Sequence, residues 1–77
     1  MQAQQRAPVH IDTQPGRFDV YRDGHRIATT PWEFEAPVGS YFKAVLKREG
    51  YKDKEIAFKV NNHGNIYLYT LEKNSTR

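Results

Sequence analysis

The chain has 77 residues, and its 22 large apolar side chains, counted without the alanines and Met1, suffice for one small core with no enclosed cofactor pocket. It contains no cysteine, which excludes disulfides, cysteine-bound zinc and a thiol nucleophile. The formal net charge is +3, but residues 7–71 hold nine basic and eight acidic side chains, so the body of the domain lacks the strong field that nucleic-acid binding needs.

Turn-forming residues punctuate the sequence roughly every eight to twelve residues and separate short runs rich in Val, Ile, Phe and Tyr. The first runs, 8–13 and 17–22, alternate apolar and polar residues, as half-buried strands do. Asp23-Gly24 joins the second run to 25–28. This dipeptide is typical of a tight β-hairpin, because both of its residues tolerate a positive φ.

Three later runs, 32–35, 40–47 and 55–60, alternate in the same way, and a last run spans 65–71. A helix over 47–59 is excluded, because Gly50 lies inside this range and no apolar stripe recurs at helical spacing. The residues expected to shape the turns are Pro15, Gly16, Asp23, Gly24, Thr30, Pro31, Gly39 and Gly50.

Seven short alternating runs without a helix predict an all-β fold. We expect a small β-sandwich of Greek-key type, with mostly antiparallel strands around a single core layer. Residues 8–71 form this domain in the prediction, and residues 1–7 and 72–77 form flexible tails.

The order and spacing of the turn formers resemble those of the PEGA domains. The matching segments are Pro15-Gly16-Arg17-Phe18, Val20-Tyr21-Arg22-Asp23-Gly24, Ala28-Thr29-Thr30-Pro31, Gly39-Ser40-Tyr41 and Glu49-Gly50-Tyr51, within a resemblance that runs from Pro8 to Leu71. The resemblance implies a compact β-sandwich that serves as a non-catalytic module, often in bacterial cell-envelope or surface proteins. A periplasmic or cell-surface location is expected on this resemblance alone, since the first residues lack the apolar stretch of a signal peptide.

Side chains suited to catalysis or metal binding are few. Ser40 lacks the following glycine of a nucleophile elbow, and Glu33 and Glu35 share one strand face, about 7 Å apart, as a solvated pair would. The candidate metal ligands are His10, Asp12, His25 and His63. They lack the close spacing of zinc sites, so surface histidines are the preferred interpretation. We therefore expect no enzyme activity, no metal and no cofactor.

The last run is apolar on both faces. Tyr67 and Tyr69 lie opposite Ile66 and Leu68, and one core layer cannot take both pairs. Two interpretations stay open. The tyrosines either form an exposed platform for a partner or cover a smaller cluster under a loop.

The expected partner is a protein or another domain of a larger chain. It would be bound through Tyr67 and Tyr69, with Trp32 or Tyr41 nearby, or by strand addition to an unpaired edge. A cell-wall glycan, contacted by the same aromatic side chains, is the first alternative. The second is single-stranded nucleic acid on the face that carries Tyr41, Lys43 and Lys47, and the neutral body of the domain argues against it.

Overall fold

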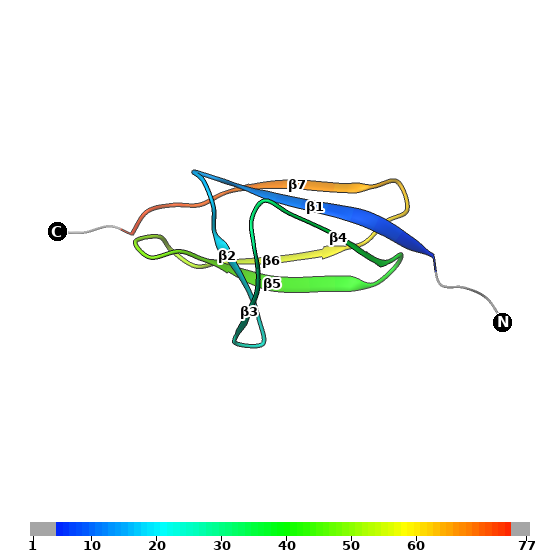
Figure 1. The fold of residues 1–77 in the computed structure, drawn as a ribbon, viewed down its shortest axis with the longest axis horizontal. Helices are drawn as coiled ribbons and strands as arrows, with labels where there is room; N and C mark the ends of the chain where they lie inside the picture. Colours follow the sequence, from blue (N-terminus) through cyan, green and yellow to red (C-terminus); the bar gives the residue numbers. More distant parts are fainter. Residues whose placement is uncertain (1–4, 75–77) are drawn as a thin grey trace.

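The computed structural model describes residues 5–74, and over this range it contains seven β-strands and no helix (Figure 1). The strands are β1 (Arg6–Gln14), β2 (Asp19–Arg22), β3 (His25–Thr29), β4 (Trp32–Pro37), β5 (Tyr41–Lys47), β6 (Lys54–Lys59) and β7 (Asn65–Thr70). They form two sheets, with strand order β4-β1-β7 in the first and β3-β2-β5-β6 in the second. The predicted all-β sandwich of seven short strands is confirmed. Since this part of the chain holds no helix, it holds none that could cross a membrane.

β1 is the central strand of the three-stranded sheet. Its residues alternate in burial, and Val9, Ile11 and Thr13 face the core. It pairs antiparallel with β4, where Val9 lies opposite Phe34, and parallel with β7, where Ile11 lies opposite Tyr67. The first and last strands of the chain are therefore direct neighbours, which is the only parallel pairing in the described range.

The four-stranded sheet is built from the hairpin β2-β3 and the hairpin β5-β6, joined where β2 pairs antiparallel with β5. Asp23 and Gly24 form the predicted tight turn with φ angles of 52° and 80°. This left-handed region is accessible to glycine and tolerated by aspartate. The β2-β3 register shifts between Val20 and Tyr21, so β3 is an irregularly paired edge strand.

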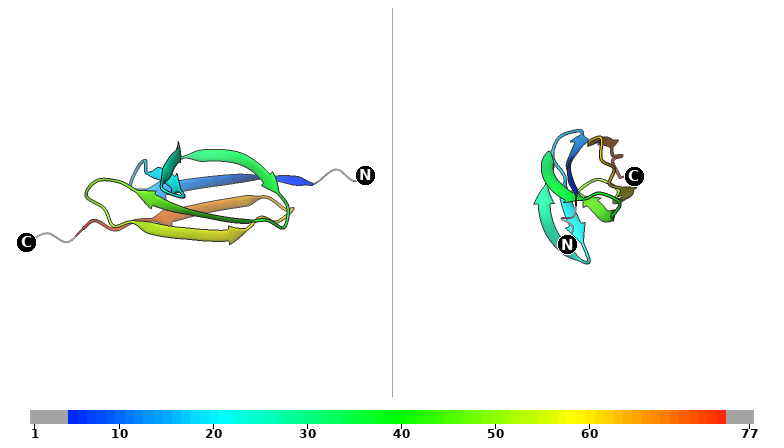
Figure 2. Two further views of the ribbon diagram at one scale, coloured as in Figure 1. Left: turned by 90° about the horizontal axis from the view of Figure 1, so that it is seen from below. Right: turned by 90° about the vertical axis from the view of Figure 1, so that its right-hand side faces the viewer.

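The two sheets face each other (Figure 2). A single layer of apolar side chains fills the space between them. Its fully buried members include Ile11, Phe18, Val20 and Leu46. A row of aromatic rings crosses this layer from β4 to β7, with successive centroids 4.1, 5.2, 5.3, 4.2 and 6.2 Å apart. The row consists of Trp32, Phe34, Phe42, Phe58, Tyr67 and Tyr69. Most of the aromatic content of the chain is accounted for by this packing.

A chain of buried hydrogen bonds links the turn after β1 to the start of β4. The Phe18 N–H donates to Thr30 Oγ1 at 2.9 Å, and the Thr13 hydroxyl donates to the Gly16 carbonyl at 2.6 Å. The two threonine oxygens are 2.5 Å apart, so the Thr30 hydroxyl donates to Thr13. Each buried hydroxyl thereby donates once and accepts once, which satisfies it without water.

The domain is longer than predicted at both ends. β1 begins at Arg6, and Ala7, which the sequence placed in a flexible tail, is buried. At the other end, Lys52 donates its backbone N–H to the Glu72 carbonyl at 2.9 Å, and Lys73 forms a bridge with Tyr51. The tail predictions for residues 1–4 and 75–77 lie outside the described residues. The eight predicted turn residues all lie between strands.

Candidate functional site at the β7 edge

The side of β7 that carries Tyr67 and Tyr69 faces the core. Tyr67 and Tyr69 are half-buried and pack against the core, whereas Ile66 and Leu68 are 83% and 58% exposed. The two interpretations left open by the sequence were an exposed platform and a separate small cluster under a loop, and neither describes the tyrosines. They extend the main core to its edge, where Tyr67 stacks on Phe58 at 4.2 Å.

Tyr69 lies at the outer end of the aromatic row. Partial burial raises the pKa of its hydroxyl, and the neighbouring Tyr67 hydroxyl raises it further. The two rings stack with centroids 6.2 Å apart. The tyrosines therefore close the side of the sandwich at β7 with their rings turned toward the core and away from the outer face.

Trp32 and Tyr41 form no common platform with Tyr67 and Tyr69. Trp32 is on β4, the edge of the three-stranded sheet opposite to β7. Tyr41 is on β5 of the other sheet with its ring exposed, whereas Tyr67 and Tyr69 pack against the core. Trp32 and Tyr41 instead line a groove of about 430 Å³ together with Ile27. Tyr41 is 71% exposed, but one face of Trp32 is covered by the Phe34 ring at 4.1 Å.

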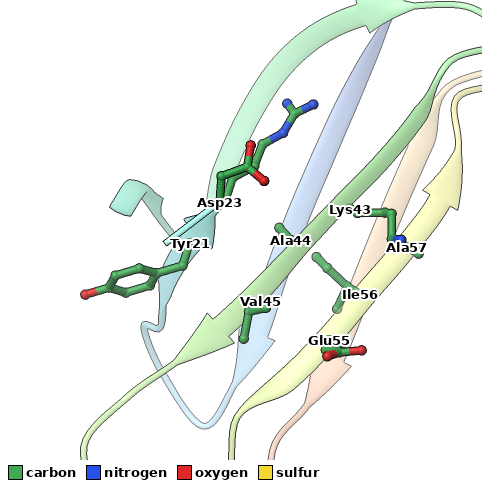
Figure 3. A pocket seen from close by; sticks show the side chains of 9 residues that line it. Tyr21, Asp23, Lys43, Ala44, Val45, Glu55, Ile56 and Ala57 are labelled. Atoms are coloured by element: carbon green, nitrogen blue, oxygen red, sulfur yellow. The ribbon is translucent and has the colours of Figure 1, made fainter. Parts of the chain in front are cut away.

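The predicted basic face is the outer surface of β5 and carries both signs of charge. Lys47 lies 3.8 Å from Asp53 and over the Tyr21 ring at 5.0 Å. Lys43 shares an open depression of about 550 Å³ with Glu55, as Figure 3 shows. The outer surface of β5 therefore carries both signs of charge, as mixed solvent-exposed surfaces do.

Of the polar side chains considered for catalysis or metal binding, His10 and Glu33 come into contact. His10 Nδ1 is 3.3 Å from a Glu33 carboxylate oxygen, across the β1-β4 pair. Within residues 5–74, no three His, Cys, Asp or Glu side chains come close enough to hold a metal ion. Ser40 donates its hydroxyl to the Pro37 carbonyl at 2.6 Å, which makes it part of a turn.

The four edge strands differ in whether they carry features that hinder pairing with a further strand. Natural edge strands resist unwanted pairing with charges, proline, bulges or short length. Three of the four described edges carry such features. β4 has Glu33, Glu35 and Pro37. β3 has His25, Arg26 and the register shift, and β6 has Lys54, Glu55 and Lys59. β7 reads Asn-Ile-Tyr-Leu-Tyr-Thr and carries none of them. It is the unprotected edge of the sandwich.

The backbone groups that β7 offers follow from one hydrogen bond. The Leu71 N–H donates to the Gln14 carbonyl at 2.9 Å and so points toward β1. Successive residues of a strand point their backbone groups to alternate sides. Ile66, Leu68 and Thr70 therefore direct their N–H and C=O groups away from β1, toward the open edge.

A buried amide fixes the start of this edge. Asn65 donates from its side chain to the Pro8 and Asn61 carbonyls, both at 3.1 Å, and accepts the Asn61 N–H at 3.0 Å. With all three contacts made, the amide ties the loop before β7 to β1 and sets the strand in its phase. An asparagine in the core phase of a strand was not anticipated from the sequence. The sequence does hold one signal for this phase, because Leu71, which is buried, alternates in step with Tyr67 and Tyr69.

The outer face and the open edge thus coincide on the same residues. Ile66 and Leu68 present exposed apolar side chains and unpaired backbone groups together, an arrangement suited to strand addition. No family model, curated protein or solved structure matches the chain.

Proposed function

We propose that this protein is a non-catalytic interaction module that binds an extended segment of a protein partner along β7. The observation that carries the proposal is the uncharged, unpaired edge of β7 next to three edges that carry charges, proline or a bulge. In strand addition, backbone hydrogen bonds supply affinity and alternate side chains supply selectivity. Ile66 and Leu68 would supply the apolar contacts on the outer face.

The setting of the module is proposed on different grounds. The resemblance to PEGA domains supports a bacterial envelope or surface protein, in which such a module binds or spaces other components. This part of the proposal rests on the order of turn formers between Pro8 and Leu71. It is independent of the β7 edge.

The edge proposal is tested by nuclear magnetic resonance with a defined probe. The probe is an octapeptide of alternating valine and threonine with lysines at both ends, and the control peptide has its two central residues replaced by proline. We expect the first peptide to shift the amide resonances of Ile66, Leu68 and Thr70 and to slow their hydrogen exchange, because these N–H groups are open in the free protein. In a sample dilute enough for the chain to be monomeric, amides along β7 that stay unshifted at millimolar peptide would refute strand addition.

Two matched variants locate the effect. Leu68→Lys places a charge on the exposed face of β7 and should remove the peptide response. Ile27→Lys makes the same kind of change at another exposed apolar position, on β3, and should leave it intact. A response that Ile27→Lys abolishes and Leu68→Lys spares would place the binding edge elsewhere.

Glycan contact is a second candidate function, favoured by the shared groove of Trp32, Tyr41 and Ile27. The exposed Tyr41 ring offers an amphipathic surface on which a sugar ring stacks. Titration with a chitin tetrasaccharide, followed by the fluorescence of Trp32, tests it. A change that Tyr41→Ala removes supports glycan binding, and an unchanged spectrum at millimolar sugar excludes it at this groove.

A further inference from the structure

The open edge of β7 matches a copy of itself. An isologous interface needs one surface patch that is complementary to itself about a two-fold axis. β7 has no charge to oppose its own image, and its exposed apolar residues would meet their equivalents. We infer that the strand taken up along β7 is β7 of a second copy of this chain, in antiparallel orientation, and this inference rests on the proposed function.

The outward backbone groups define the pairing. Residues with backbone groups directed at the partner form the hydrogen-bonded pairs of an antiparallel ladder. With the two-fold axis at Leu68, Leu68 faces its equivalent and Ile66 faces Thr70, which gives about six N–H···O bonds. Two three-stranded sheets would then join into a continuous sheet with the order β4-β1-β7-β7-β1-β4.

The second layer is complementary about the same axis. The stacking of Phe58 on Tyr67 places β6 beneath β7, and both strands lie on the right in the end-on view of Figure 2. Because β6 and β7 are consecutive strands joined by a short loop and run in opposite directions, the axis through Leu68 passes near Ala57. Glu55 and Lys59 flank Ala57 at equal distance along β6, and both are exposed.

The axis would therefore place Glu55 of each copy across from Lys59 of the other. This charge complementarity favours a second copy over an arbitrary extended segment, which would meet the same two charges without a matching pair. The paired sheet would also add no further copies. The outer edges of the joined sheet would be two β4 strands with Glu33, Glu35 and Pro37, which discourage further addition.

The test is the oligomeric state of the complete chain, measured by sedimentation equilibrium between micromolar and millimolar concentrations. We expect a reversible dimer in the wild type. Leu68→Lys should raise its dissociation constant at least about tenfold, because two lysines would meet at the axis. Leu68→Pro, which removes an outward N–H, should have a similar effect, and Ile27→Lys should have none.

A charge swap tests the second layer. Glu55→Lys alone should raise the dissociation constant, since two lysines would then face each other, and the double variant Glu55→Lys/Lys59→Glu should restore it. A chain that is monomeric at millimolar concentration overturns the inference, as does a dimer indifferent to both Leu68 variants. A monomer that still binds the valine-threonine peptide through β7 overturns the self-pairing alone. A monomer that does not bind the peptide overturns the proposed function as well.

Discussion

Proline substitution at neighbouring positions of β7 tests which backbone groups face β1. By the register of the parallel pair, the Tyr67 N–H points at the His10 carbonyl, whereas the Leu68 N–H points to the open edge. Proline removes the N–H, and alanine at the same position removes only the side chain. The difference between the two variants in free energy of unfolding therefore isolates the hydrogen bond.

At Tyr67 this difference should be about 2–4 kcal/mol, because a ladder bond is lost and a carbonyl is left unpaired. At Leu68 it should stay below about 1 kcal/mol, because no bond to β1 is broken and proline is tolerated where an edge N–H faces solvent. Urea unfolding at a protein concentration low enough for the chain to be monomeric, followed by the fluorescence of the single tryptophan, Trp32, measures both.

One result of the proline and alanine comparison would contradict the prediction. A proline-alanine difference at Leu68 that equals or exceeds the one at Tyr67 would show that the outward residues are assigned to the wrong phase. The open edge would then be formed by Tyr67 and Tyr69, and the binding surface described above would not exist. A Tyr67→Pro variant that does not fold agrees with the expectation, provided that Tyr67→Ala folds.

Three further predictions concern the polar groups around the core. Thr30→Val should lower the free energy of unfolding, measured in urea, by about 1–3 kcal/mol, because the buried Phe18 N–H loses its acceptor. Thr30→Ser keeps the hydroxyl and should recover most of this loss. Equal effects of the two variants would contradict the prediction. Asn65→Asp should destabilise the domain by a similar amount, since a carboxylate would face the Pro8 carbonyl in place of an amide donor, and unchanged unfolding would show that this contact is dispensable. The raised pKa of Tyr69 favours its neutral form in the folded state, so this contribution to stability is complete below the ordinary value of 10.0 and is lost as pH rises through the folded pKa. Between pH 9 and pH 11, the free energy of unfolding should therefore fall less in Tyr69→Phe than in the wild type. An equal fall in both proteins would refute the raised pKa of Tyr69.

The strands and turns could be predicted because their signals are local. Alternation in 40–47 and the Asp23-Gly24 turn depend on neighbours along the chain, and both are found in the structure. The ends were placed too far inward. Ala7 and Lys73 become ordered by pairing with residues distant in sequence, which local pattern does not reveal.

The candidate site was predictable only in part. An unpaired edge strand was one of the binding surfaces expected from the sequence, but the sequence did not indicate which edge. The alternating pattern shows that Ile66 and Tyr67 face opposite sides of the sheet, and it does not show which of the two sides is the core. The side of β7 that faces the core is set by Asn65. Its side-chain amide donates a hydrogen bond to the carbonyl of Pro8, which is far away in the sequence. Likewise, the separation of Trp32 from Tyr69 depends on the strand order β4-β1-β7, which arises from the parallel pairing of the first and last strands.

Tension along the chain would act directly on that parallel pair. β1 starts at one end of the sandwich and β7 finishes at the other, so a pull on the two ends slides one strand along its neighbour (Figure 1). The hydrogen bonds between residues 9–14 and 65–70 lie across the direction of the pull. They are loaded together, whereas a hairpin pulled open at one end breaks its bonds in succession. A pull on the two ends of the domain would therefore have to break the β1-β7 hydrogen bonds together.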